Sequence, residues 1–447
     1  MSFFSGPLRI LRLAWPVMIS MMSYSLMSAA DAIFVGRLGT IPLAAIGLAV
    51  TGTFLFIGLP MGLVRGLRVA TAQATGAERS STVEVLGWQA VWLALGTGLA
   101  VVIASPLGSP MFHLLGATSA VREEALAYFT VRVYAAPIAL LVMAFTAWFE
   151  GRGDTRTPMA ANVTANLLCV ALDAVLVSGA GPIPALGIRG AAWAGVISLS
   201  VSALWLFRAA WPTLRRVRWR PHRALLAESF RLGLPIGVQR LLDIFAWTLL
   251  TGVLASISDV ELAAHVIAIR VLMLSFLPGL AIAEATAVLV GQAVGAKNAD
   301  DAHAAWRAGS VTAIVVMALG GLGFVLAPHL LISAFGAAPE VVPIARNLLW
   351  IAAAFQLVDA VATVTYFSLD GAGDTRFTLV ASLTLSWFVK LPVGVLLARY
   401  AHLGAVGAWL GLTGELVLLL VVLLWRWRSR RWFLEPAMRV VSAAAPA

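Results

Sequence analysis

The residues best suited to chemistry in this sequence are aspartates that interrupt long apolar stretches. Asp31 lies within 15–39, a stretch long enough to cross a bilayer, for which about 20 mostly apolar residues suffice. The residues one, two and three helical turns before it share its face: Met27, Tyr24 and Ser20. Because a carboxylate facing lipid is costly, we predict that Asp31 faces a protein-lined cavity and binds a proton or a cation. Tyr24 and Met27 would then line the substrate cavity.

A second polar stripe runs along the stretch 158–179. Its members fall at helical spacing on one face: Asn162, Asn166, Cys169 and Asp173. Hydrogen bonding between helices would explain Asn162, but a buried ionised carboxylate needs a cation or a proton. Neither Asp31 nor Asp173 has a basic residue within one turn of its own helix. We therefore expect the two acids to share one site, where like charges and burial favour reversible proton uptake.

The second half of the chain has its own charged residues within apolar stretches. Asp243 follows Arg240 by three residues, so an ion pair within one helix competes with a role in ion binding. Asp359 has no basic neighbour in its stretch, and Lys390, one of two lysines in the chain, is predicted to be its charge partner. Two glutamates in apolar stretches are weaker candidates: Glu284 and Glu415.

The composition defines the class of protein that must position these residues. Hydrophobic residues make up 61% of the chain and charged residues 12%, with a mean hydropathy of +0.93. Soluble globular domains do not have this composition, so we expect an all-α polytopic membrane protein. The net charge of +10 comes from arginines between the apolar stretches, a pattern typical of the positive-inside rule rather than of nucleic-acid binding.

Twelve apolar stretches can be marked, and each is expected to be a transmembrane helix. They lie at about 11–36, 41–74, 85–109, 121–150, 158–179, 187–212, 228–256, 260–293, 305–333, 340–369, 377–400 and 403–427. Arginine-rich segments at both ends and at 215–223 predict cytoplasmic termini and a cytoplasmic central linker. The predicted domains are an N-terminal six-helix lobe (1–212), a basic linker (213–227), a C-terminal six-helix lobe (228–427) and a cytoplasmic tail (428–447).

An internal repeat relates the two halves. RLAWP at 12–16 recurs as RLGLP at 231–235, and AQATGA at 72–77 recurs as GQAVGA at 291–296, both at an offset of 219 residues. GRGDTR at 151–156 returns as GAGDTR at 371–376, and its glycines are expected at turns. Six spans in each half predict two lobes in the same orientation, related by an axis along the membrane normal. The embedded aspartates have no counterparts at this offset, which favours functional roles for them.

In these motifs the sequence resembles the multidrug and toxic compound extrusion (MATE) family of secondary transporters. The motifs that carry the resemblance are AWPVMI followed by Asp31, ADAIFVGRLG, LAAIGLA, the two GDTR loops and AAHVIAIRVLMLSFLPGLAIAEATAVLVGQAVGA. The resemblance covers essentially the whole chain. It implies twelve helices in two lobes, alternating access, and export of organic cations driven by proton or sodium entry.

The resemblance also implies roles for individual residues. Asp31 and Asp173 match family positions tied to proton coupling, and Asp243 and Asp359 match positions tied to cation binding, with Na⁺ as the candidate ion. Two positions depart from the family's pattern: Cys169 stands where asparagine is common, and Phe355 where tyrosine is common.

These observations together predict an antiporter rather than an enzyme. The sequence lacks a G-x-x-x-x-G-K-[ST] motif, a nucleophile elbow and histidine or cysteine spacing typical of a metal site. We expect multidrug efflux of amphipathic, cationic organic compounds in exchange for H⁺ or Na⁺, without a cofactor or nucleic acid, by a monomer in the cell membrane. The predicted ion-coupling residues are Asp31, Asp173, Asn166, Asp243 and Asp359, with Lys390 and Arg240 as charge partners and Tyr24, Met27 and Asn162 in the substrate cavity. The alternative is a flippase for lipid-linked saccharides, but embedded acids outnumber embedded bases, which favours cationic substrates.

Overall fold

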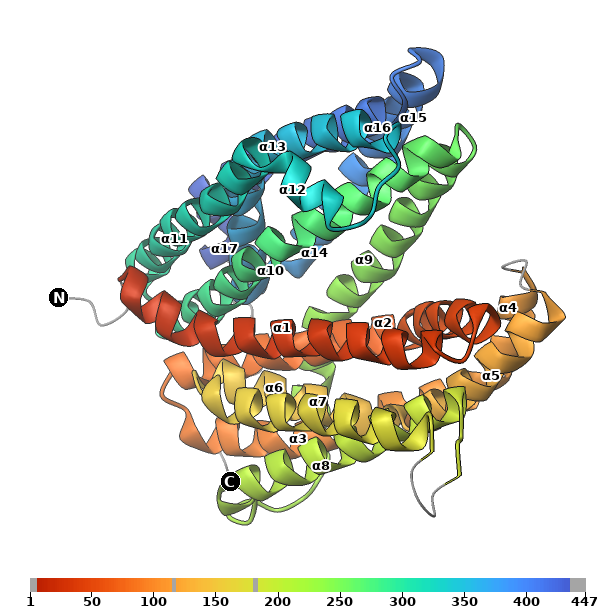
Figure 1. Cartoon of the computed structure of the whole chain (residues 1–447). Helices are drawn as coiled ribbons and strands as arrows, with labels where there is room; N and C mark the ends of the chain where they lie inside the picture. The colour runs from red at the N-terminus through yellow and green to blue at the C-terminus, as the bar shows by residue number, and fades with distance from the viewer. Residues whose placement is uncertain (1–5, 115–117, 180–183, 435–447) are drawn as a thin grey trace. The chain divides into compact units, whose positions relative to one another are not determined.

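The chain folds into helices throughout the part that the computed structural model describes, residues 6–114, 118–179 and 184–434 (Figure 1). Within these ranges, 11 helices are long and apolar enough to cross a membrane. The pair α5 (Ser119–Tyr134) and α6 (Ala136–Gly151), bent by 53° at its junction, supplies a twelfth span. The expected all-α, polytopic membrane fold is therefore confirmed.

The helices follow the predicted apolar stretches closely. Those of the first half are α1 (Pro7–Gly36), α2 (Thr40–Gly76), α3 (Ser80–Ala104), η1 (Ser105–Leu107), α4 (Gly108–Leu114), α5, α6, α7 (Arg156–Leu176) and α8 (Ile188–Leu214). Those of the second half are α9 (Arg223–Ala255), α10 (Asp259–Gly295), α11 (Ala299–Leu326), α12 (Pro328–Ser333), α13 (Val341–Ala372), α14 (Thr375–Leu385), η2 (Ser386–Lys390), α15 (Leu391–Val395), η3 (Leu396–Tyr400), α16 (Gly404–Arg428) and α17 (Arg431–Leu434).

The internal repeat is visible in the helix ends. Helices α2 and α10 both have 37 residues, and each end of α10 lies 219 residues after the corresponding end of α2. The glycines of the two GDTR loops behave as expected, since Gly153 and Gly373 adopt left-handed φ values of 84° and 92°. In the first loop the Asp154 carboxylate accepts the Thr157 N–H at 3.1 Å, whereas Asp374 pairs with Arg426 at 2.7 Å.

The two halves differ at their fourth span. In the first half it breaks between α5 and α6, where Pro137 stands in the first turn of α6. Proline has no N–H to donate, and its ring collides with the carbonyl four residues earlier, so a continuous helix is disfavoured there. The repeat places Gln356 at this position in the second half, and α13 runs unbroken through it.

The chain divides into two compact units. The N-terminal unit comprises residues 19–237, and the described part of the C-terminal unit comprises 6–18 and 238–434. Helices α1 and α9 each belong partly to both units, and they contain Pro16 and Pro235 respectively. The connection between α8 and α9 spans 215–222, inside the predicted linker, and residues 435–447 of the predicted tail lie outside the described residues.

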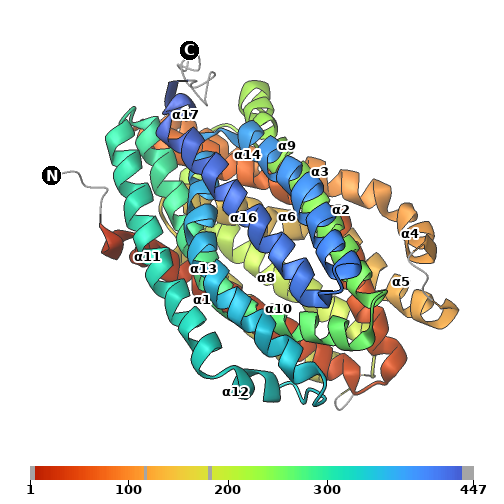
Figure 2. The same cartoon turned by 90° about the horizontal axis from the view of Figure 1, so that it is seen from above.

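Small residues allow close helix packing inside each unit. In the C-terminal unit, α10, α11 and α13 pack side by side (Figure 2), and Gly371 of α13 lies against the backbone of Ala287 in α10. In the N-terminal unit, Gly151 of α6 lies in the same way against the backbone of Arg68 in α2. A side chain at either glycine would collide with main-chain atoms. This explains why both repeated motifs, GRGDTR and GAGDTR, begin with glycine.

Candidate functional site

The structure brings the two N-terminal acids together. In the N-terminal unit, Asp31 of α1 meets Cys169 and Asp173 of α7, and one ligand atom from each lies within 4.8 Å of the others. Asp173 is 0% exposed, Cys169 is 1% exposed, and Asp31 is partly exposed. Both oxygens of Asp173 and Oδ1 of Asp31 are buried without a hydrogen-bond partner among the described residues. A buried carboxylate in this state is stabilised by a proton or a bound cation.

The polar stripe of α7 ties this helix to its neighbours. The Asn166 side-chain amide donates to Ser23 Oγ of α1 at 2.8 Å, and Ser202 Oγ of α8 donates to Asn162 Oδ1 at 3.1 Å. The second bond agrees with a packing role for Asn162. The first places Asn166 two turns from Asp173, on the same face of α7, where it fixes α1 against α7 near the acids.

A basic residue that is not among the predicted site residues lies near the same acids. Arg132 of α5 interacts electrostatically with Asp31 and Asp173. Its guanidinium lies against Gly195 of α8, where a Cβ atom would collide with it. A cation therefore lies near the acids although neither has a basic residue within one turn of its own helix, because Arg132 comes from a different helix. An arginine in an apolar span, five residues before Pro137, was the signal that could have revealed it.

The predicted cavity residues of α1 are both accessible in part. Tyr24 is 43% exposed, and Met27 is partly exposed. Tyr24 also interacts electrostatically with Arg132 and Asp31, so it lies close to the acid pair. Helix α1 as a whole is thinly covered, since only 6% of its most apolar window is buried.

In the C-terminal unit, Lys390 does not pair with the predicted acid. Its ammonium lies 5.5 Å from the ring centroid of Trp247, and it interacts electrostatically with Asp243 and Glu415. Lys390 is 4% exposed and Glu415 is 6% exposed, so both charges are buried. Glu415, which the sequence analysis ranked below the aspartates, is therefore part of this charge cluster.

Asp359 finds its partner in its own helix. Its Oδ1 accepts a hydrogen bond from Thr363 Oγ1 at 3.0 Å, and Lys390 forms no ion pair with it within the described residues. The predicted Asp359–Lys390 pair is thus wrong in this structure. Sequence spacing could not reveal this, because the two residues lie on different helices and their approach depends on how those helices pack. Arg240 acts electrostatically on Asp243, as their spacing suggested.

The local sequence around Lys390 explains how it is positioned. Lys390 ends a π-helical segment, Ser386–Lys390, and Pro392 follows two residues later. Proline cannot accommodate the carbonyl four residues before it, and widening the preceding turn relieves this clash. A wider turn changes the direction of the side chains that follow it, so Pro392 helps to set where the ammonium points.

A polar network adjoins this cluster in the same unit. Gln239 of α9 donates to Ser382 Oγ at 2.8 Å and accepts a hydrogen bond from the Tyr366 hydroxyl. Gln239 lies one turn before Asp243, so the network and the charge cluster occupy one face of α9. The network joins α9, α13 and α14.

Each of the two charge clusters contains one more acid than base. In the N-terminal unit, Asp31 and Asp173 face the single cation Arg132. In the C-terminal unit, three acids face two bases: Asp243, Asp359 and Glu415 against Lys390 and Arg240. With all groups ionised, each cluster has one uncompensated negative charge, which a proton, a sodium ion or one cationic group would neutralise.

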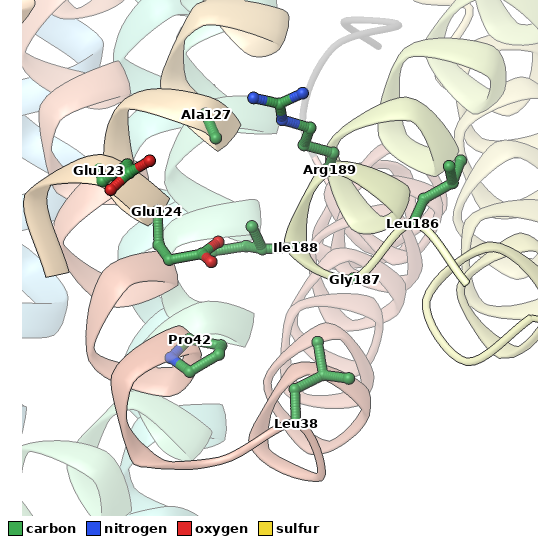
Figure 3. A pocket seen from close by; sticks show the side chains of 9 residues that line it. All are labelled: Leu38, Pro42, Glu123, Glu124, Ala127, Leu186, Gly187, Ile188 and Arg189. Atoms are coloured by element: carbon green, nitrogen blue, oxygen red, sulfur yellow. The ribbon is translucent and has the colours of Figure 1, made fainter. Parts of the chain in front are cut away.

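A cavity of about 370 Å³ opens at the end of the N-terminal unit, away from these clusters. Figure 3 shows its lining, which comes from the α1–α2 connection, the first turns of α5 and the start of α8. The charged residues that line it are Glu123, Glu124 and Arg189. None of the predicted site residues lines it.

The fold and these clusters define a polytopic membrane protein with ionisable groups held inside its spans, the arrangement of a secondary transporter. The sequence model of the MatE family matches residues 16–175 and 235–396. The multidrug resistance protein NorM of Burkholderia vietnamiensis is 31% identical over 448 residues, which cover 96% of this chain and 95% of the relative. The probable multidrug resistance protein NorM of Thermotoga maritima is 26% identical, with 95% and 92% covered.

Solved structures agree with the sequence comparison. One, described as the outward-facing conformation of a multidrug resistance MATE family transporter of the MOP superfamily, matches with a TM-score of 0.85 at 25% identity. The match covers 95% of this chain and 96% of the other. The chain therefore belongs to the MatE family of membrane transporters.

Proposed function

We propose that this protein is a secondary antiporter that exports amphipathic, cationic organic compounds in exchange for protons, with the coupling site at Asp31 and Asp173. The observation that carries the proposal is the meeting of these two acids beside Arg132, inside the spans of a MatE family member. The relatives named as multidrug resistance proteins support the efflux of varied compounds.

The charge balance explains how this site exchanges one cation for another. Two carboxylates and one guanidinium leave a single negative charge, so the cluster is neutral with one proton bound. A cationic substrate nearby would meet the same charge, and the two cations would compete for it. Competition of this kind lets proton entry release the substrate, provided that one conformation binds the proton more tightly and the other binds the substrate more tightly.

Helix α1 is suited to respond to the proton. It carries Asp31, is thinly covered, and is tied to α7 by the Ser23–Asn166 hydrogen bond. When both Asp31 and Asp173 are ionised, they repel each other across α1 and α7, and a proton removes this repulsion. The proton therefore changes the free energy of one α1 position relative to another, which a coupled transporter requires.

The test is transport of tetraphenylphosphonium in proteoliposomes with an imposed proton or sodium gradient. We expect the proton gradient to drive transport by the wild type, and the Asp31→Asn protein to lose it while still inserting into the membrane. The matched change Asp243→Asn should be milder. Transport driven only by sodium, or loss in Asp359→Asn with full activity in Asp31→Asn, would place coupling in the C-terminal unit.

The remaining features of the proposal follow from the sequence. We place the protein in the cell membrane as a monomer, with both termini cytoplasmic, acting without a cofactor on small organic substrates. A flippase for lipid-linked saccharides is less well supported, because a pyrophosphate group would enter clusters whose uncompensated charge is negative. Transport of tetraphenylphosphonium would decide for the antiporter, and movement of an anionic lipid-linked saccharide without it would decide for the flippase.

A further inference from the structure

We propose that Asp31, Cys169 and Asp173 form a binding site for a thiophilic divalent cation, such as Zn²⁺ or Cd²⁺, and that the bound ion blocks proton coupling. The blocking half of this proposal rests on the proposed function. The binding half rests only on the geometry of the three side chains.

The three ligand atoms are close enough to share one ion. One thiol sulfur and one oxygen from each carboxylate lie within 4.8 Å of one another. A tetrahedral zinc ion holds sulfur at about 2.3 Å and oxygen at about 2.0–2.2 Å, so its ligands lie roughly 3.5 Å apart. Side-chain rotations that move each ligand atom by about 1 Å therefore suffice to bring all three within bonding distance of one ion. Cys169 and Asp173 are four residues apart on one helical face, and this spacing already points both toward Asp31.

The state of Asp173 points independently to a ligand. Its side chain is 0% exposed, neither of its oxygens accepts a hydrogen bond from a donor group among the described residues, and the Asp31 carboxyl lies within hydrogen-bonding reach. Burying an unsatisfied carboxylate is costly, and coordination to a cation compensates for that cost. Asp31 is partly exposed, so an ion can reach the buried pair from its side.

The charges favour a divalent ion once the thiol joins the site. A metal-bound sulfur is a thiolate, because its proton leaves to solvent when the metal–sulfur bond forms. Two carboxylates and one thiolate then face Arg132, which leaves two uncompensated negative charges. A divalent cation neutralises them. Sulfur also selects against Mg²⁺ and Ca²⁺, which prefer oxygen ligands.

The sequence predicts that Asp31 and Asp173 share one site, and the family resemblance makes Na⁺ the candidate ion at Asp243 and Asp359. Its histidines and single cysteine lack the spacing typical of a metal site, so Cys169 is not predicted as a ligand. Its place beside both acids depends on the packing of α1 against α7.

The experiment uses the purified full chain in detergent micelles, titrated with CdCl₂ and followed by the ultraviolet absorption of the cadmium–thiolate bond. Cys169 is the only cysteine in the chain, so the absorption reports on this site alone. We expect saturation at one Cd²⁺ per chain, no signal from Cys169→Ser, and no response to MgCl₂. Asp31→Asn and Asp173→Asn should each weaken Cd²⁺ affinity more than about tenfold, because even outer-shell changes cost 10–100-fold.

A second measurement separates the two halves of the proposal. Cd²⁺ should stop tetraphenylphosphonium transport by the wild type, and a chelator should restore it. Absence of the absorption in wild type, or unchanged affinity in both aspartate variants, would overturn the site, since a thiol alone would then explain any binding. Saturable binding with undiminished transport would overturn the blocking role alone. Transport that proves independent of protons would refute the proposed function and leave the absorption result standing.

Discussion

Lys390 offers a direct test of how the C-terminal charge cluster is arranged. The structure places it with Asp243 and Glu415 and above the ring of Trp247, not with Asp359. Replacing it by methionine keeps the length of the side chain and removes the charge. Glu415, which is 6% exposed, then loses its nearest basic partner in a buried setting.

The size of the effect follows from burial. Removing one partner of a buried ion pair costs about 3–5 kcal/mol, and we expect less, about 1–2 kcal/mol, because Lys390 acts on Asp243 and Glu415 without an ion pair to either among the described residues. For a unit of this size, 1 kcal/mol shifts the melting temperature by roughly 2–4 °C, so Lys390→Met should lower it by roughly 2–8 °C. Thermal unfolding of purified protein, followed by tryptophan fluorescence, measures this shift.

Two double variants distinguish the possible partners. Adding Glu415→Gln to Lys390→Met removes the unpaired charge, so it should recover about 1 kcal/mol or more of the loss. Adding Asp359→Asn serves as the matched control, and its effect should add to within about 0.5 kcal/mol because the two residues do not interact. Recovery by Asp359→Asn but not by Glu415→Gln would refute the arrangement described above.

Three further predictions address the N-terminal unit and the topology. Gly195→Val should displace the Arg132 guanidinium and reduce proton-driven transport by at least about tenfold, and Gly195→Ser, which adds the same Cβ atom but less bulk, should reduce it less; wild-type activity of both variants would contradict the contact. Asp31→Asn should leave drug binding measurable by equilibrium dialysis but abolish the proton release that accompanies it in the wild type, and undiminished proton release in this variant would exclude Asp31 from coupling. A single cysteine at Val217, in a background without the native cysteine, should react with a membrane-impermeant maleimide only from the cytoplasmic side, and labelling from outside would reverse the proposed orientation.

Much of this molecule can be predicted from local patterns in the sequence. Apolar stretches of sufficient length predict the spans, and the constant offset of the repeat predicts the equal lengths of α2 and α10. Helical spacing predicts that Asn166 and Asp173 share a face. These features depend on periodicity and composition, which any window of the sequence displays.

The missed features all depend on contacts between helices. Arg132 lies on α5, which packs against α2 and α8, and only this packing brings its side chain near the acids of α1 and α7. Lys390 was assigned to Asp359 because both were isolated in their own spans, but the turn before Pro392 and the position of Trp247 direct it elsewhere. A sequence can show that a buried charge needs a partner. Choosing among several partners requires the three-dimensional arrangement.

The two prolines of the repeated RLAWP and RLGLP motifs lie close to the points where the chain passes from one unit to the other. Helix α1 passes from one unit to the other after Met18, and α9 does so after Gly237. Pro16 and Pro235 each stand two residues before these points. A proline removes one backbone hydrogen bond from its helix, so bending the helix there breaks fewer hydrogen bonds than bending it elsewhere. Within the described residues, the chain therefore crosses between the units twice, each time at the same position of the repeat and two residues after a proline that weakens the helix.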